Sequence, residues 1–375
     1  MKIRNLFVHR DVSDSDIVRD MTSRLDISAT IVDRSADVYH FVSRADDPVQ
    51  RGKETLFLTT NQGPFVRECP GTRFYTCCGY HILHIGTFCN MDCAYCILQA
   101  YFHPPVLQFF VNHDDLFAQL NAVLAQPGIR RIGTGEFTDS LIWEPLTHLS
   151  GSLIQKFSEQ SRSILELKTK TVAIQGLKAL NHQRKTILAW SLNTDRVIAE
   201  QERHTTPLKA RLRAAAECES RGYPLAFHFD PIVIYDGCEA EYRQVIQSLF
   251  LHVSPQNIVW ISLGTFRFMP DLKAIIQNRF PESNMIYGEF ITGLDGKMRY
   301  FKPIRLNIYQ KLAGWIKEIA PNVLVYFCME DDEIWEKTLG IIPSAVGGVS
   351  RMLDDSAARH CGLTAGDERQ IQKQN

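Results

Sequence analysis

From residue 81 onward, short β-branched or aromatic runs of this 375-residue sequence alternate regularly with longer helical stretches. The short runs are largely apolar throughout, which is typical of strands buried on both faces of a parallel sheet. Each helical stretch is long enough for a βα crossover. We predict strands at His81–Gly86, Arg131–Gly135, Ile164–Lys170, Thr186–Asn193, Pro224–Ile232 and Asn257–Thr265, and helices at Asp114–Ala125, Leu146–Gln160, Val172–Leu180, Pro207–Arg221 and Glu239–Phe250.

Six consecutive βα units predict an α/β fold, a partial (β/α)6 TIM-like barrel, with its chemistry at the carboxyl ends of the strands. The barrel is expected to span residues 79–268. An N-terminal α/β extension over residues 1–78 is expected to contain a helix, Ser13–Ser23, and two β-rich runs, Asp37–Ser43 and Glu54–Thr60.

After residue 268 the alternation stops, so residues 269–375 are expected to form a C-terminal extension rather than another βα unit. Met285–Phe290 and Met298–Ile304 predict a hairpin. Ile308–Ile319 predicts a helix and Asn322–Phe327 a strand. The sequence after about Gly340 has the composition of a loose tail.

The charge balance limits the kinds of partner. Lys and Arg total 41 against 42 Asp and Glu, so no global field attracts nucleic acid or an anionic membrane, and any such contact needs a local patch. No apolar stretch approaches the ~20 residues of a membrane span, and the first apolar run is too short for a signal peptide. We expect a cytoplasmic protein, in which clustered cysteines bind metal or perform chemistry.

Three of the ten cysteines lie on the loop that follows the first predicted strand, in the run Cys89-Asn-Met-Asp-Cys93-Ala-Tyr95-Cys96. Three thiolates so close together can hold three irons of a cubane cluster and leave the fourth iron without a protein ligand. Two alternatives remain open. A zinc site needs a fourth ligand, for which His103 is a candidate, and the cysteines could also simply be buried.

Polar residues follow the next three strands at the same predicted edge. These are Gly135 and Glu136, then Lys170, then Ser191 and Asn193. Glycine at such a turn permits close backbone approach, and a cation and polar groups converge on the same rim. Each could instead be an ordinary turn or a solvated rim residue. His228 and Asp230 follow on the fifth strand, with a buried hydrogen-bonded pair as the alternative.

The cysteine spacing and its position resemble the radical S-adenosylmethionine (SAM) enzymes. The resemblance implies a [4Fe–4S] cluster on Cys89, Cys93 and Cys96, with SAM bound to the open iron. It also implies reductive cleavage of SAM to a 5′-deoxyadenosyl radical, with electrons from a donor such as flavodoxin or ferredoxin. Gly135, Glu136, Lys170, Ser191 and Asn193 are then candidate SAM residues.

A longer match resembles the spore photoproduct lyase family of radical SAM enzymes. It includes Ile97-Leu98-Gln99 after the cysteines, Thr169-Lys170, Ser191-Leu-Asn193, Gly222-Tyr-Pro-Leu225 and Met298-Arg-Tyr300. The resemblance implies a DNA repair lyase that cleaves a methylene-bridged thymine dimer and quenches the product radical through a cysteine and two tyrosines. Tyr95 matches one tyrosine, but Ile97 replaces the second, and no cysteine occurs near Glu136–Phe137, where the donor is expected.

A basic segment raises the question of DNA binding independently of the resemblance. Residues 296–311 contain five cations and three aromatic residues and no carboxylate. Such a hairpin suits phosphate contact and base stacking, although solvated basic hairpins are common. The candidate nucleic-acid residues are Arg299, Tyr300, Lys302 and Arg305.

Three functions remain open on the sequence alone. The leading one is a radical SAM lyase that repairs a thymine dimer or a related base lesion in DNA. The second is radical modification of a different substrate, such as a peptide, RNA or nucleotide, which the missing donor cysteine favours. The third is a non-catalytic iron–sulfur sensor, which would not require the polar residues at the rim.

Overall fold

The six predicted strands assemble into one curled sheet in the computed structural model, which describes residues 2–72 and 74–364. The sheet has eight strands in the order β18-β14-β13-β11-β10-β9-β5-β4, and all neighbours run parallel except β4 and β5. This is the predicted α/β partial barrel. The bounds are β4 Val66–Glu68, β5 His81–Leu83, β9 Arg130–Gly133, β10 Ser163–Thr169, β11 Thr186–Ser191, β13 Leu225–Ile232, β14 Ile258–Thr265 and β18 Val325–Phe327.

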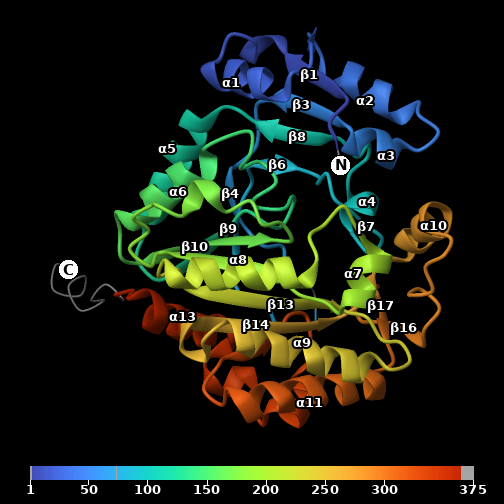
Figure 1. Ribbon diagram of the computed structural model, residues 1–375, viewed down its shortest axis with the longest axis vertical. Helices are drawn as coiled ribbons and strands as arrows, with labels where there is room; N and C mark the ends of the chain where they lie inside the picture. The colour runs from blue at the N-terminus through green and yellow to red at the C-terminus, as the bar shows by residue number, and fades with distance from the viewer. Residues whose placement is uncertain (1, 73, 365–375) are drawn as a thin grey trace.

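Helices cover the outer face of this sheet (Figure 1). Their apolar residues recur at helical spacing and pack against strands that are buried along nearly their whole length. The predicted helix over Val172–Leu180 is wrong, because only a 3-10 turn forms at Gln175–Leu177 and Gly176 in its middle weakens a helix. The covering helices are α5 His113–Leu124, α6 Leu149–Ser158, α8 Leu208–Ser220, α9 Cys238–His252 and α11 Lys302–Ile319.

The C-terminal region corrects the expectation of a separate extension. Strand β18 pairs in parallel with β14 after the crossover helix α11, so it forms a further βα unit of the same sheet. Sequence periodicity does not reveal this unit, because a long insertion separates β14 from α11. That insertion contains β15 Arg267–Phe268, α10 Pro270–Arg279, β16 Phe290–Thr292 and β17 Met298–Tyr300.

The predicted loose tail after Gly340 is also wrong for the residues that the structure describes there. After α12, Asp332–Leu339, the chain forms α13, Gly348–Cys361, against the barrel. Arg131 bonds Asp354 of α13 at 2.7 Å, and the Ser356 hydroxyl donates to the Val259 carbonyl at 2.6 Å. Residues 365–375 lie outside the described part of the chain.

A second sheet, built mainly from strands near the N-terminus of the chain, lies beside the barrel at the top of Figure 1. Its order is β2-β1-β3-β8-β6, and β8 and β6 come from the segment expected to belong to the barrel. The sheet boundary therefore does not coincide with residue 78. The strands are β1 Asn5–His9, β2 Ala29–Val32, β3 Thr55–Thr59, β6 Gly86–Thr87 and β8 Leu107–Phe110.

Three helices accompany these strands: α1 Asp16–Leu25, α2 Ser35–Ser43 and α3 Pro48–Lys53. The predicted β-run at Asp37–Ser43 is wrong, because this segment lies in α2. Val38 and Val42 are its buried residues, and a spacing of four satisfies both a strand period of two and one turn of helix. No helix within the described residues is long and apolar enough to cross a membrane.

Candidate active site at the cysteine loop

The three clustered cysteines lie on the loop between β6 and the short helix α4, Leu98–Tyr101. Cys89 and Cys93 are buried, and Cys96 is partly exposed. Cys93 belongs to β7, Asp92–Cys93, which pairs antiparallel with β12, Glu202–Arg203. The loop is therefore held as part of a small sheet of its own.

A fully buried cation fixes the first half of the loop. The Lys53 Nζ donates to the Cys89 carbonyl at 3.1 Å and to the Met91 carbonyl, and it lies 3.8 Å from the Asp92 carboxylate. It also stands 4.4 Å from the centre of the Phe88 ring. Lys53 can reach this position because Gly52 packs against the Pro105 backbone, where a Cβ would lie 1.5 Å from the carbonyl oxygen.

The second half of the loop is held by Gln99 and Arg279. The Gln99 amide donates to the carbonyls of Cys93, Ala94 and Cys96 at 3.0, 3.1 and 3.4 Å. Arg279, the last residue of α10, bonds the Gln99 side chain and bonds Asp92 at 3.0 Å. The described contacts therefore satisfy the backbone and leave the sulfurs largely unused, apart from the Met91 N–H that donates to Cys89 Sγ at 3.4 Å.

The donor set fits an iron–sulfur cluster better than a zinc ion. Each thiolate of such a cluster binds a different iron, so the sulfurs need not converge on one point. Among the described residues, no three His, Cys, Asp or Glu side chains are placed to hold a single ion. His103, the candidate fourth ligand, is exposed and donates to the Ala100 carbonyl at 2.8 Å. Burial raises the pKa of Cys89 to about 12, so metal binding must displace a proton there.

Tyr95 lies between the second and third cysteines and points toward a buried carboxylate. Its hydroxyl donates to Glu202, which also accepts from Arg211 at 2.5 Å. Burial opposes ionisation of Glu202, but Arg211 and Lys170 outweigh it and lower the pKa of that carboxyl. Burial beside this carboxylate raises the pKa of Tyr95, which keeps its phenolic hydrogen.

Lys170 follows β10 directly and faces the cysteine loop. Its Nζ lies 5.7 Å from the centre of the Tyr95 ring. Its backbone N–H donates to Asp139 Oδ2 at 2.8 Å, and the other oxygen of Asp139 accepts from the Thr169 hydroxyl at 2.8 Å. Asp139 therefore joins the loop after β9 to the end of β10.

Gly135 and Glu136 occupy the loop after β9, as predicted from the strand ends. A Cβ on Gly135 would lie 3.1 Å from the Lys168 Cβ and 3.2 Å from the Ser140 hydroxyl, so this close packing disfavours any larger side chain. Glu136 is half-buried. Burial opposes the charge of Lys168, but Glu136, Glu166 and Asp230 outweigh it and raise the pKa of that ammonium.

Ser191 ends β11, and Asn193 follows two residues later. The structure corrects the expectation that Asn193 is a free polar group at the rim. Its Oδ1 accepts from the Tyr242 hydroxyl at 2.7 Å and from the Thr194 N–H at 3.1 Å, and its amide donates to the Pro231 carbonyl at 2.9 Å. Asn193 is buried and ties neighbouring strand ends together.

His228 and Asp230 do not pair with each other, and each is engaged by another side chain; His228 is buried, whereas Asp230 is partly exposed. His228 contacts Glu166 at 2.8 Å and the Ser262 hydroxyl at 2.7 Å. Asp230 accepts two hydrogen bonds from Arg267, at 3.2 and 3.1 Å. The His228–Glu166 contact is buried, and the Arg267–Asp230 pair is partly exposed.

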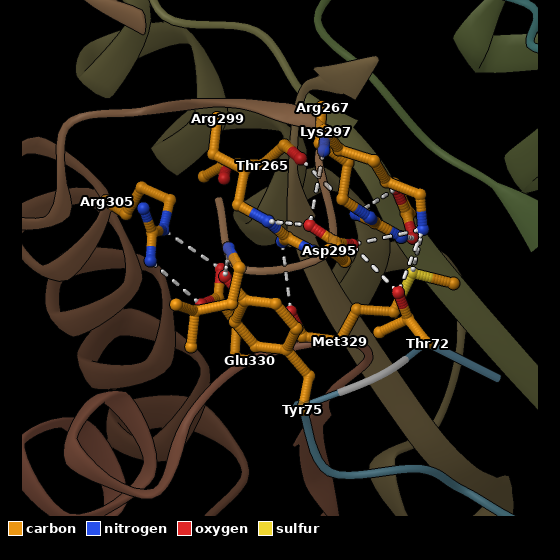
Figure 2. Close-up of polar contacts among 12 residues, drawn as sticks. Thr72, Tyr75, Thr265, Arg267, Asp295, Lys297, Arg299, Arg305, Met329 and Glu330 are labelled. Atoms are coloured by element: carbon orange, nitrogen blue, oxygen red, sulfur yellow. Dashed lines mark hydrogen bonds and ion pairs between the residues drawn. The ribbon is translucent and has the colours of Figure 1, made fainter. Parts of the chain in front are cut away.

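The basic hairpin differs most from its sequence expectation. Arg299 and Arg305 are 2% and 3% exposed, so neither side chain is available to a phosphate. Arg299 donates to Asp295 at 2.7 Å and to the Met329 carbonyl at 3.0 Å, and Arg305 donates to Glu330 at 3.1 and 3.2 Å (Figure 2). The structure gives these two arginines a structural role.

The other two candidate nucleic-acid residues are also engaged. Tyr300 is buried, and its hydroxyl accepts from the Ile234 N–H at 3.2 Å. Lys302 is partly exposed but lies 2.9 Å from Asp331 and 2.8 Å from Glu333. What the hairpin region does expose is apolar, at Leu294, Phe301 and Ile291.

Sequence reasoning missed the residues that hold the cysteine loop. Gln99 belongs to the run that carries the family resemblance, so its closeness to the cysteines in sequence could have indicated a role beside them. Lys53 lies 36 residues before Cys89, and Arg279 lies 180 residues after Gln99. No local sequence pattern indicates that either residue contacts the loop. Asp139 and Glu202 are single carboxylates in loops or short strands and likewise carry no local signal.

A partial parallel barrel that carries three cysteines in this spacing, on the loop after its first strand, defines a radical SAM enzyme. Comparison with known proteins narrows the class. The model of the family described as "Spore photoproduct lyase" matches residues 76–319, and the chain belongs to that family of radical SAM, iron–sulfur DNA repair lyases.

Curated relatives and solved structures agree with this assignment. Spore photoproduct lyase of Bacillus subtilis is 28% identical over 66% of this chain and 75% of its own. The enzyme of Clostridium acetobutylicum is 24% identical over 67% and 71%. A solved spore photoproduct lyase double mutant, with bound AdoMet (SAM) and dinucleoside spore photoproduct, superposes with a TM-score of 0.76 at 21% identity. It covers 87% of this chain and 100% of its own, and it shows the fold.

Proposed function

We propose that this chain binds a [4Fe–4S] cluster through Cys89, Cys93 and Cys96 and binds SAM at the adjoining strand ends. We further propose that it acts on DNA by cleaving a methylene-bridged thymine dimer or a related base lesion. When bound and reduced, the cluster and SAM together supply a 5′-deoxyadenosyl radical. The observation that carries the proposal is the cysteine loop, in which buried donors satisfy the backbone carbonyls and leave three sulfurs for iron.

Residues at three neighbouring strand ends support the SAM part of the proposal. Gly135 permits close approach of a ligand to the backbone, Lys170 offers a cation for a carboxylate, and Glu136 offers a carboxylate for an amino group. Ser191 contributes a hydroxyl at the end of β11. Asn193 acts indirectly, because its own side chain is bonded to Tyr242 and Pro231.

Tyr95 has a defined task in this scheme. Its hydroxyl is held by Glu202, and Glu202 is held in turn by Arg211, which is fully buried. A phenol in such a fixed hydrogen bond can lose and regain its hydrogen without large motion of the ring. We assign Tyr95 to the radical relay, as the resemblance implies.

The test is anaerobic incubation with reductant, SAM and an oligonucleotide that contains one methylene-bridged thymine dimer. We expect 5′-deoxyadenosine to form and two thymines to replace each dimer. Formation of 5′-deoxyadenosine with the dimer intact would refute the substrate. Absence of 5′-deoxyadenosine from a fully loaded enzyme would refute the radical chemistry and favour the iron–sulfur sensor.

A second candidate is radical modification of a peptide, RNA or nucleotide. The observation that favours the peptide among these is the hairpin, where Arg299 and Arg305 are buried against carboxylates and offer no charge to the phosphate backbone of DNA or RNA. Turnover of SAM that is stimulated by such a substrate, and not by the dimer oligonucleotide, would select this candidate.

A further inference from the structure

A second group of cysteines gathers where the two edges of the curled sheet meet. Cys69, Cys77 and Cys78 lie between β4 and β5, and Cys328 follows β18 directly. Strands β4 and β18 are the two ends of the eight-stranded order. The Thr76 N–H donates to the Glu330 carbonyl at 3.3 Å, so the chain before β5 lies beside the chain after β18.

Three of these thiols form a continuous series. Cys77 and Cys78 are adjacent in the sequence, and the Cys328 thiol lies close enough to be the largest influence that raises the pKa of Cys78. Cys328 and Cys78 are partly buried, whereas Cys77 is exposed. The series therefore leads from the barrel to the surface. Cys328, together with burial, raises the pKa of Cys78 to about 11, so at neutral pH Cys78 keeps its S–H bond.

Cys328 faces the inside of the barrel. Tyr326 pairs in register with Ser262, and the Ser262 hydroxyl contacts His228 at 2.7 Å inside the barrel. Because alternate residues of a strand share one face, Cys328, two residues beyond Tyr326, continues that inward face. Lys168 interacts with Asp230 and with Glu136, on the loop where the family's donor cysteine is expected. Against the opposing effect of burial, Cys328, Asp230 and Glu136 all raise the pKa of the Lys168 ammonium, so all three lie on the side of the interior that Lys168 occupies.

We propose that Cys328 is the hydrogen-atom donor that quenches the product radical, with Cys78 and Cys77 as a relay to the surface. This inference rests on the proposed function. The S–H bond of Cys328 breaks, a C–H bond forms on the product radical, and a thiyl radical remains on Cys328. Cys238 is a less suitable donor because it belongs to α9, one of the helices that cover the outer face of the sheet, and not to a strand or to the chain that directly follows one.

This thiol relay completes the task for which Tyr95 alone is insufficient, because Ile97 replaces the second tyrosine, and it restores the donor by two further hydrogen-atom transfers. A hydrogen atom moves from Cys78 to the Cys328 thiyl, and another moves from Cys77 to the Cys78 thiyl. Each transfer breaks one S–H bond and forms one S–H bond. A small-molecule thiol in solution then donates a hydrogen atom to exposed Cys77, and two of the resulting thiol radicals combine as a disulfide.

The geometry can be tested without substrate. In the Cys77→Ser holoenzyme, which lacks the competing vicinal thiol, anaerobic treatment with one equivalent of diamide should join Cys78 to Cys328. Peptide mapping would identify the bridged fragments. Recovery of Cys78 and Cys328 as separate free thiols, under conditions that oxidise added glutathione completely, would overturn the relay.

The donor role is tested with the dimer oligonucleotide in D2O, where thiol hydrogens exchange. The wild-type enzyme should place one deuterium in the product for each dimer opened. Cys328→Ser should lower the yield of repaired thymine at least tenfold while 5′-deoxyadenosine formation stays within twofold. Cys78→Ser should retain the first turnover and slow later ones. Cys361→Ser, at a buried thiol on α13, is the matched control and should behave as wild type.

The outcomes separate the two proposals. A wild-type enzyme that cleaves SAM and leaves the dimer intact overturns the proposed function and the donor role with it. A wild-type enzyme that opens the dimer, beside a Cys328→Ser variant with unchanged yield and deuterium content, overturns the donor role alone.

Discussion

The cysteine loop and the basic hairpin are both held by buried hydrogen-bond donors, but the donors bond different kinds of acceptor in the two regions. At the loop, Lys53 and Gln99 donate mainly to backbone carbonyls, and the sulfur atoms stay available. At the hairpin, Arg299 and Arg305 donate to the carboxylates of Asp295 and Glu330, and little charge remains for a ligand. Availability to a ligand therefore depends on which atoms the rest of the protein has already satisfied.

The largest expected effect is at the loop. Replacing Cys93 with Ala removes one of the three thiolates that hold the cluster, and the two that remain cannot retain a cubane cluster. We expect reconstitution to fall from ~4 irons per chain to below ~1. Iron analysis and the visible absorbance of the cluster measure this. A Cys218→Ala variant, at a buried thiol on α8, should bind iron normally, and a full cluster in Cys93→Ala would contradict the assignment.

The matching change at the hairpin affects stability rather than cofactor. Arg299→Ala leaves Asp295 buried beside a single remaining cation, Lys297 at 3.2 Å. Breaking a buried pair on one side costs about 3–5 kcal/mol of unfolding free energy. Urea denaturation should show this loss with unchanged iron content. A loss of unfolding free energy below ~1 kcal/mol, together with weaker DNA binding, would instead support Arg299 as a nucleic-acid contact.

The contrast also explains what the sequence could predict. The six barrel strands and the cysteine loop follow from local periodicity and from covalent spacing, both of which are visible in a single sequence. The state of the hairpin cations is not local. A window over residues 296–311 shows no carboxylate, yet Asp295 lies just outside it and Glu330 and Asp331 lie far beyond it.

Two errors in the fold have the same origin. Strand β18 follows α11, and α11 is separated from β14 by the segment 266–301, so the regular alternation in the sequence stops before the last βα unit. The α2 segment carries buried Val38 and Val42, a spacing that also suits a strand, and only its packing decides between them. The residues that brace the cysteine loop could not be predicted because they come from α3 and α10.

The two regions should also differ in their response to pH. Near the cysteine loop, burial and then Arg67 lower the pKa of His84 to about 4, against about 6.5 in an unfolded chain. The unfolded state binds more protons between these values, so stability falls as pH drops from about 6.5 toward 4, by up to about 3 kcal/mol. At the hairpin, Arg299 holds the pKa of Asp295 well below its usual range, so that contribution is lost only in stronger acid.

His84→Gln tests this difference, because glutamine can still accept the hydrogen bond from Arg67, which is 3.0 Å in the native protein. Between pH 7 and 5 the variant should lose less unfolding free energy than wild type. His40→Gln, at an exposed histidine, should follow the wild-type curve. Parallel pH profiles for His84→Gln and wild type would show that His84 does not couple protonation to folding.

The smallest expected effect is at Lys302, the one member of the predicted nucleic-acid set that is partly exposed. It is shared by Asp331 and Glu333, so Lys302→Ala should change the unfolding free energy by less than ~1 kcal/mol. A free phosphate contact would lower the slope of log K against log salt for DNA binding by about 1 when removed. Because its charge is already neutralised, we expect a change well below that in anisotropy titrations. A full unit would show that DNA displaces Asp331 and Glu333, and that the hairpin becomes available to DNA through exchange of partners.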